Sequence, residues 1–284
     1  MNKIKMLFKS ITYQIYFSMK NKFSKVRIEN EGYNLIVSLT SYGLRMKHVH
    51  LTIESIFHQV VMPSAVVLWI TKDDEFNVTP QLQRLVGRGL IIRVVDEDLR
   101  SYKKLVHTYE SCLSEGKEPT IITIDDDVYY PKLFISQLLA YSKLYPESTI
   151  CTRGHVLISN ASGDFDYNLC MRESQKSINN IVREYNLMPT GVGGILYPFN
   201  SLSCEIADRK VFKEICADAD DIWFKAITLK NGFSTVKIPE ESHYPPIISA
   251  LSSGLKFINV GEGKNNKRLK DVLNYFSLMD FFKV

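Results

Sequence analysis

Residues 120–131 read Thr-Ile-Ile-Thr-Ile-Asp-Asp-Asp-Val-Tyr-Tyr-Pro. The first five predict a buried strand, because β-branched side chains suit a pleated, packed surface. Three carboxylates, Asp125 to Asp127, follow directly, and Pro131 opens an amphipathic helical pattern that runs to Leu144. Ligands in open α/β sheets bind just outside the carboxyl ends of the strands. We therefore expect the three aspartates to lie at a ligand site on the edge of such a sheet.

Three adjacent carboxylates repel one another, by about 1 kcal/mol for a pair about 4 Å apart even in water. A cation close to them would offset this repulsion, and hard oxygen ligands at this density suit Mg²⁺ or Mn²⁺. The sequence thus predicts a divalent metal site. The alternative is a solvated acidic turn that caps the helix after it.

The overall composition is that of an ordinary globular protein, with 284 residues of which 45% are hydrophobic and 23% charged. Its five cysteines are scattered and form no C-x-x-C pair. This pattern indicates reduced thiols in a cytoplasmic protein and argues against a disulfide framework or a zinc site.

Positive charge is concentrated at the N-terminus. Residues 1–27 hold seven of the 35 basic residues and no acidic one, so the remaining 28 basic residues face 31 acidic ones. The lysines alternate with aliphatic and aromatic residues, which predicts an amphipathic helix making peripheral contact with an anionic membrane, on the inner face of the cytoplasmic membrane. A helix packed on the domain's own flank, or a frayed terminus, is the alternative. The charge distribution does not indicate a nucleic-acid partner.

Strand and helix patterns alternate from residue 34 to residue 124. Predicted strands occupy 34–40, 65–71, 90–95 and 120–124, and predicted helices occupy 46–59, 80–88 and 101–114. This alternation is typical of an α/β fold with a Rossmann-type open, mostly parallel sheet, wound by right-handed crossovers and flanked by helices.

The pattern is looser after residue 150. Residues 159–190 are polar and irregular, and we expect a loop there. The segment 191–198 is rich in glycine but is not the dinucleotide motif G-x-G-x-x-G. Its glycines either allow a ligand to approach the backbone or form an ordinary bulge. A strand at 234–238 and a terminal helix at 265–282 complete the prediction.

Two adjacent aspartates, Asp220 and Asp221, open a helix that runs to about Lys230. Negative charge is stabilised at a helix N-terminus by about 0.3–1 kcal/mol. One of the two is therefore expected to cap the helix, while the other would suit a general base.

The order of these features resembles bacterial glycosyltransferases of the GT-A fold that build lipopolysaccharide and capsule. The matching pieces lie between about residues 33 and 275, and in this sequence they are Ser38-Leu-Thr40-Ser-Tyr-Gly-x-Arg45, Tyr102-Lys-Lys-Leu105, Asp125-Asp-Asp-Val-Tyr-Tyr-Pro131, Gly191-x-Gly-Gly-x-Leu-Tyr-Pro198, Ala219-Asp-Asp-Ile-Trp-Phe224 and Asn265-Asn-Lys-x-Leu269. The sequence departs from the resemblance at Asn266-Lys267, where similar sequences have an aspartate first.

On the donor side, the resemblance implies binding of a nucleotide sugar, with UDP as the nucleotide. Thr40 and Arg45 would lie near the nucleotide, Asp96 near the base and Lys104 near ribose or phosphate. Asp125 and Asp126 would reach ribose and metal, and Asp127 would hold the Mn²⁺ or Mg²⁺. His243 is a further candidate metal ligand, although a lone histidine in a loop is more often structural.

On the acceptor side, the resemblance implies that Asp221, with Asp220 as its substitute, deprotonates a hydroxyl of a saccharide or lipid-linked saccharide. Gly193, Gly194 and Trp223 would lie on this side, unless Trp223 belongs to the core. The implied organisation is a basic segment at 1–30 and a single GT-A-like domain at 31–284, with a nucleotide-sugar half at 31–150 and a smaller acceptor half at 151–284.

Two other functions fit parts of the pattern. Asp125 and Asp127 also match the nucleophile motif of haloacid-dehalogenase-like phosphatases, but that motif normally follows the first strand and three strands precede it here. A non-catalytic sugar- or nucleotide-binding domain is the second alternative.

Overall fold

The computed structural model describes residues 3–29, 34–157, 170, 181–239, 244–248 and 264–282. The chain divides into two compact units. Unit 1 consists of residues 1–108, 119–139 and 242–254, and unit 2 of residues 109–118, 140–241 and 255–284. Each unit therefore combines segments that are distant in the sequence.

Unit 1 is built on four parallel strands in the order β3-β2-β1-β4. Their bounds are β1 Leu35–Thr40, β2 Ala65–Thr71, β3 Leu90–Val95 and β4 Thr120–Thr123. All seven residues of β2 are buried, as expected for a parallel strand covered on both faces. The predicted parallel sheet and the bounds of β2 and β3 are confirmed.

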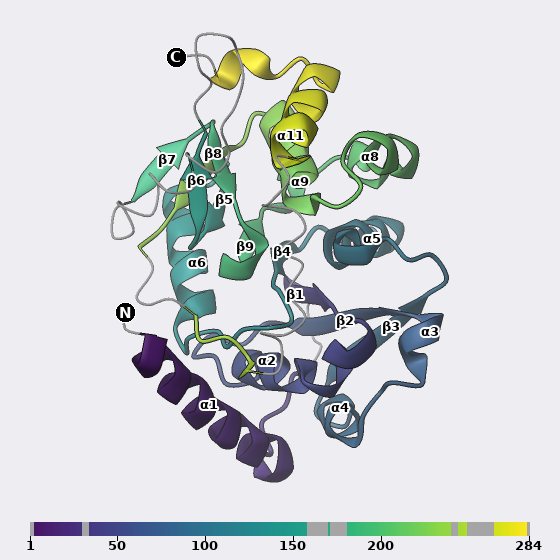
Figure 1. The fold of residues 1–284 in the computed structure, drawn as a ribbon, viewed down its shortest axis with the longest axis vertical. Helices are drawn as coiled ribbons and strands as arrows, with labels where there is room; N and C mark the ends of the chain where they lie inside the picture. The colour runs from purple at the N-terminus through teal and green to yellow at the C-terminus, as the bar shows by residue number, and fades with distance from the viewer. Residues whose placement is uncertain are drawn as a thin grey trace. The chain divides into compact units, whose positions relative to one another are not determined.

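Helices lie on both faces of this sheet. In the described part of unit 1 the helices are the 3-10 helices η1 (Gly43–Lys47) and η2 (Arg100–Tyr102), α2 (Val49–Ile56), α3 (Lys72–Glu75), α4 (Pro80–Val86), and the first parts of α5 (Lys103–Ser114) and α6 (Phe134–Leu144). Thr108 of α5 accepts a hydrogen bond from Trp69 Nε1 at 2.8 Å and shares one with Ser38 at 2.8 Å. These bonds fix α5 on one face, and α2 and α4 lie on the other (Figure 1).

The N-terminal helix α1 (Lys3–Phe23) packs on α2 and α4 (Figure 1). Asn21 Nδ2 donates to Glu54 Oε1 at 2.9 Å, and Asn21 Oδ1 accepts from Arg84 Nε at 2.9 Å. Phe17 stacks on Tyr129, with ring centroids 5.5 Å apart. The predicted helix is confirmed, and its inner face is part of unit 1. None of the helices in the described ranges is long and apolar enough to cross a membrane.

Unit 2 holds a mixed sheet in the order β9-β5-β10-β7. β5 (Ser148–Cys151) and β10 (Ser234–Lys237) are parallel, while β9 (Ile195–Tyr197) and β7 (Val182–Glu184) are antiparallel to their neighbours. A second, antiparallel pair joins β6 (Gly154–Val156) to β8 (Leu187–Pro189). The loop predicted at 159–190 is thus wrong for residues 182–184 and 187–189, which are strands because their backbones pair with β10 and β6. Most of the remaining predicted loop, residues 159–169 and 171–180, lies outside the described part of the chain.

In the described part of unit 2 the helices are α8 (Arg209–Ile215), α9 (Asp220–Lys230) and α11 (Lys264–Tyr275), together with the second parts of α5 and α6 and the 3-10 helices η4 (Gly191–Gly193), η5 (Phe199–Ser201), η6 (Cys204–Ala207) and η8 (Met279–Phe282). The single terminal helix predicted to run to Phe282 is wrong. Ser277 has φ 57°, a left-handed conformation that ends α11 at Tyr275 before η8 begins.

Candidate functional site

The three aspartates follow β4 at its carboxyl end, in unit 1. β4 pairs with β1 in a register that places Thr123 opposite Ser38, so the loops after these two strands leave the sheet side by side. The order β3-β2-β1-β4 makes the gap between β1 and β4 the point where the connections diverge. Open α/β sheets bind their ligands at this kind of point.

Arg45 of η1 joins the two loops. Its guanidinium donates to Asp126 Oδ1 and to Asp127 Oδ2, the second at 3.1 Å. Burial lowers the pKa of Arg45, but the carboxylates of Asp126 and Asp127 outweigh burial and raise this pKa above its ordinary value. Arg45 therefore remains a cation that draws the loop after β1 onto the loop after β4.

Asp126 is the inner member of the triplet, with only 4% of its side chain exposed. Ser41 Oγ donates to its Oδ2 at 2.6 Å, while Arg45 binds its Oδ1. Burial raises the pKa of Asp126 to about 6, although the charge of Arg45 acts in the opposite direction. With both oxygens held by the protein, Asp126 positions the loops. Sequence reasoning missed the role of Ser41, whose one signal was its place beside Thr40 in a shared motif.

Asp125 and Asp127 are the outer members, with 34% and 29% of their side chains exposed. Lys104 Nζ donates to Asp125 Oδ1 at 2.9 Å. The backbone N–H of Asp125 donates to the hydroxyl oxygen of Tyr130 at 3.0 Å, a second contact that the sequence did not indicate. Arg45 and Lys104 thus supply cations that offset much of the repulsion among the three carboxylates, and one negative charge remains in excess within this cluster.

The residues present fit a divalent cation that arrives with a phosphorylated ligand. Among the described residues, no three His, Cys, Asp or Glu side chains form a ready metal cage. Mg²⁺ commonly needs no such cage, because it binds through one or two carboxylates, waters and the phosphates of a substrate. Asp125 and Asp127 are partly exposed carboxylates of this kind. The expected further ligand, His243, lies outside the described residues.

The other donor-side candidates lie along the same edge of the sheet. Thr40, the last residue of β1, donates from Oγ1 to the carbonyl oxygen of Trp69 at 2.8 Å. Asp96 follows β3, forms an ion pair with Lys72, and has 80% of its side chain exposed. Because β2 and β1 separate β3 from β4 in the sheet, Asp96 is not drawn into the cluster around Asp126.

The two helix-opening aspartates lie in unit 2, at the start of α9. Asp220 is buried, whereas Asp221 is half-buried and accepts a hydrogen bond from the backbone N–H of Gly191 at 2.9 Å. Asp221 therefore binds the first residue of η4 (Gly191–Gly193), so the helix start and the glycine segment are brought together. The residue before α9, Ala219, has no side chain that could cap the helix.

Both predicted acceptor-side glycines have structural roles. A Cβ on Gly193 would lie 2.6 Å from the Cβ of Arg153, and Gly194 has φ 73°, which favours glycine. Trp223 is fully buried, and its indole N–H donates to the carbonyl oxygen of Ile206 at 3.1 Å. The acceptor-side role expected for Trp223 is therefore wrong, because a fully buried ring has no face open to a sugar.

No protein-family model and no curated protein matches the sequence. Solved structures do match. The mannosyltransferase PcManGT from Pyrobaculum calidifontis, solved in complex with GDP-Man and Mn²⁺, is 11% identical over 98% of this chain and 79% of that one, with a TM-score of 0.51. This likeness confirms the predicted GT-A-like α/β fold.

Two further structures match with lower TM-scores. TarS from S. aureus, residues 1–349, is 14% identical with a TM-score of 0.46, over 74% of this chain and 59% of TarS, so this chain spans less than two thirds of that protein's length. A 4-diphosphocytidyl-2C-methyl-D-erythritol synthase from Anaerococcus prevotii is 13% identical over 82% of this chain and 98% of that one, with a TM-score of 0.47.

Proposed function

We propose that this protein is a metal-dependent glycosyltransferase that moves a sugar from a nucleotide-sugar donor, UDP-linked, to a saccharide acceptor. Synthesis of a bacterial surface polysaccharide or lipopolysaccharide is the process that the sequence resemblance suggests. The observation that carries the proposal is the cluster of Arg45, Lys104 and the three aspartates between β1 and β4. The fold shared with a mannosyltransferase solved with GDP-Man and Mn²⁺ supports it.

The donor-side chemistry follows from the charges of the cluster. When a nucleotide sugar reacts, the diphosphate leaves with growing negative charge, and a divalent ion held by Asp125 and Asp127 would stabilise that charge. Arg45 is a fixed cation within reach of Asp127, and Lys104 is one within reach of Asp125. Both side chains would therefore hold the phosphates by charge-assisted hydrogen bonds.

The acceptor side is assigned to Asp221 as general base, with Asp220 beside it. A base must be ionised and held in place until the acceptor hydroxyl arrives. The bond from the backbone N–H of Gly191 orients Asp221 and stabilises its charged form. A saccharide or lipid-linked saccharide acceptor, and peripheral contact with the inner face of an anionic membrane, belong to the same proposal.

A screen of nucleotide sugars tests the proposed reaction, with Mn²⁺ or Mg²⁺ and with released nucleoside diphosphate as the readout. We expect release to need the metal and to fall by at least about 100-fold in Asp127→Ala, because this carboxylate would hold the ion. Asp73→Ala is the matched control, since Asp73 is an exposed carboxylate after β2 in the same unit.

Four results would overturn the proposal. Full activity in the presence of a chelator would exclude a role of the metal in the reaction. Equal activity of Asp127→Ala and Asp73→Ala would exclude a role of the aspartate cluster. Release of inorganic phosphate from simple phosphoesters would indicate the phosphatase alternative, while binding of nucleotide sugar without any turnover would indicate a binding domain.

A further inference from the structure

Helix α1 has a second apolar face, opposite the side that packs on unit 1, whose side chains are largely exposed. Its inner face is buried at Ser10, Phe17 and Asn21. The outer face carries apolar residues three or four positions apart, each between 40% and 68% exposed. This set, named here the outer stripe, consists of Ile4, Phe8, Ile11, Ile15 and Met19.

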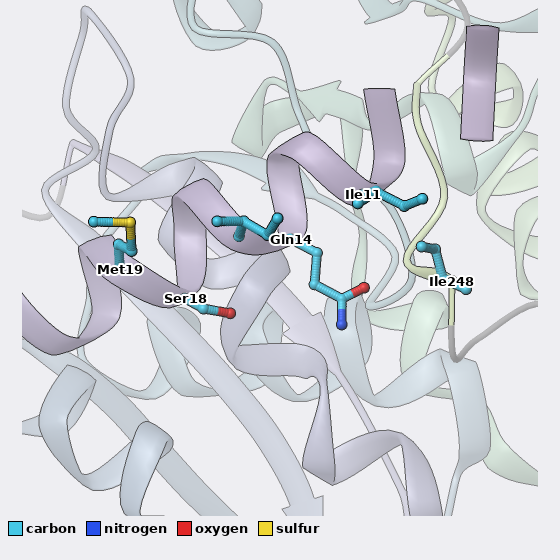
Figure 2. A pocket seen from close by; sticks show the side chains of 6 residues that line it. Ile11, Gln14, Ser18, Met19 and Ile248 are labelled. Atoms are coloured by element: carbon cyan, nitrogen blue, oxygen red, sulfur yellow. The ribbon is translucent and has the colours of Figure 1, made fainter. Parts of the chain in front are cut away.

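A hollow of about 510 Å³ opens beside the outer stripe. It is lined by Ile11, Gln14, Ile15, Ser18, Met19 and Ile248. Figure 2 shows Ile11 and Ile248 at one end of this hollow and Met19 at the other. The lining of the hollow is mostly apolar and offers water few hydrogen bonds, so a hydrocarbon chain would fill it more favourably than water.

Lysine side chains border the apolar stripe. Lys5 and Lys22 are exposed, and Lys9 and Lys20 lie over the rings of Tyr13 and Tyr16 at 5.7 and 5.4 Å. Residues 1–27 contain no acidic residue that could neutralise them. A helix with an apolar stripe and a cationic border matches the boundary between the headgroups and the acyl chains of an anionic bilayer.

The same charges argue against a second copy of the chain as the occupant. Apolar residues at a spacing of three and four would also suit a paired helix. Pairing two α1 helices through the outer stripe would bring two segments of seven basic residues together, with no acidic residue on either to offset them. Charge complementarity therefore favours anionic lipid.

We propose that the outer stripe of α1 and the hollow beside it form a docking surface for an anionic phospholipid bilayer, with an acyl chain occupying the hollow. This inference deepens the peripheral membrane contact proposed above and does not require the transfer reaction. The inner face of α1 holds the helix on unit 1 through Phe17 and Asn21, so docking would leave the fold of the unit unchanged.

Co-sedimentation of the full chain with vesicles tests the surface. Vesicles of phosphatidylcholine with phosphatidylserine should bind the protein at low salt, and vesicles of phosphatidylcholine alone should bind it at least about tenfold more weakly, because each basic residue near an anionic surface contributes. Removing the apolar contact in a Phe8→Ser, Ile15→Ser double variant should lower partition by at least about tenfold. Phe76→Ser is the matched control, since Phe76 is 94% exposed elsewhere in unit 1.

Circular dichroism and release of nucleoside diphosphate, measured without vesicles, should be the same for the double variant and the wild type. Absence of binding to the phosphatidylserine vesicles would overturn the inference, as would an equal loss in Phe76→Ser. If the wild type is a dimer in solution and the double variant is a monomer, the outer stripe is instead a contact between two copies of the chain. Binding to vesicles and the oligomeric state are measured without turnover, so the docking surface and the transferase activity can fail separately.

Discussion

Replacing Arg45 by methionine should destabilise the protein, and by more at neutral pH than at acidic pH. Asp126 is almost fully buried, and Arg45 supplies the positive charge beside it. Removing one partner of a buried ion pair typically costs about 3–5 kcal/mol, because the other charge is left uncompensated. We expect a loss in this range at neutral pH, since methionine keeps much of the length of the side chain but not its charge.

The pH dependence follows from Asp126. Its pKa is about 6 in the folded protein and 3.8 when unperturbed. A raised carboxyl pKa means that the unfolded state releases this proton first, so the group lowers stability as the pH rises from 3.8 through the folded pKa. Without Arg45 the folded pKa rises further, and the penalty continues to grow above pH 6. At about pH 7.5 the extra loss is up to about 2 kcal/mol, from about 1.4 kcal/mol per pH unit, whereas at about pH 5 it is close to zero.

Urea unfolding of the wild type and Arg45→Met at about pH 5 and about pH 7.5 measures both quantities. The double variant Arg45→Met, Asp126→Asn is the matched control, because its amide cannot titrate and its stability relative to wild type should lack the additional loss at neutral pH. A loss below about 1 kcal/mol at neutral pH, or an equal loss at the two pH values, would refute the assignment of Arg45 as the partner of a buried carboxylate.

Two further predictions concern unit 2. Asp221→Asn should lower turnover by about 10²–10⁴-fold and leave donor affinity unchanged, since it removes the proposed proton acceptor, whereas Asp220→Asn should act mainly on stability. Steady-state kinetics of the two variants check this, and a larger loss of turnover in Asp220→Asn than in Asp221→Asn would assign the base to Asp220. Lys225 is fully buried, its Nζ donates to Thr235 Oγ1 at 2.8 Å, and burial lowers its pKa from 10.5 to about 7. The unfolded state therefore binds more protons between these two pH values, and the stability of the wild type rises with pH over this interval. Lys225→Met should thus be more stable than the wild type at about pH 6 and should lose more than half of that advantage by about pH 9 in urea unfolding; a pH-independent difference would contradict this.

The sequence predicted the sheet of unit 1 well because its strands are locally encoded. Runs such as Ala65–Thr71 and Leu90–Val95 combine β-branched residues with polar or acidic residues at their ends, so their bounds follow from the residues themselves. The end of α11 was not predictable in this way. It depends on a left-handed serine, Ser277, which is a residue type that carries no strong signal for that conformation.

The resemblance predicted that the aspartates, Arg45 and Lys104 lie at one site. The residues that hydrogen-bond to the aspartates could be identified only from the folded structure. Ser41 and Tyr130 look ordinary in the sequence and acquire roles only because β1 and β4 are neighbours. Trp223 was misplaced because an aromatic residue beside two aspartates can face either a ligand or the core. The structure decides for the core, where its ring lies 5.2 Å from that of Phe276.

The segment Tyr244–Ile248 has a consequence for how this protein reaches its native state. Ile247 N–H donates to the carbonyl oxygen of Asp127 at 2.8 Å, and Tyr129 N–H donates to that of Pro245 at 3.0 Å. These bonds join parts of the chain more than a hundred positions apart, and contacts of such long range form late because closing the intervening loop costs entropy. During synthesis on the ribosome, the loop after β4 therefore stays without this support until residues near 247 have left the exit tunnel. Every residue of the cluster formed by Arg45, Lys104 and the three aspartates is therefore made well before the segment that supports the loop after β4.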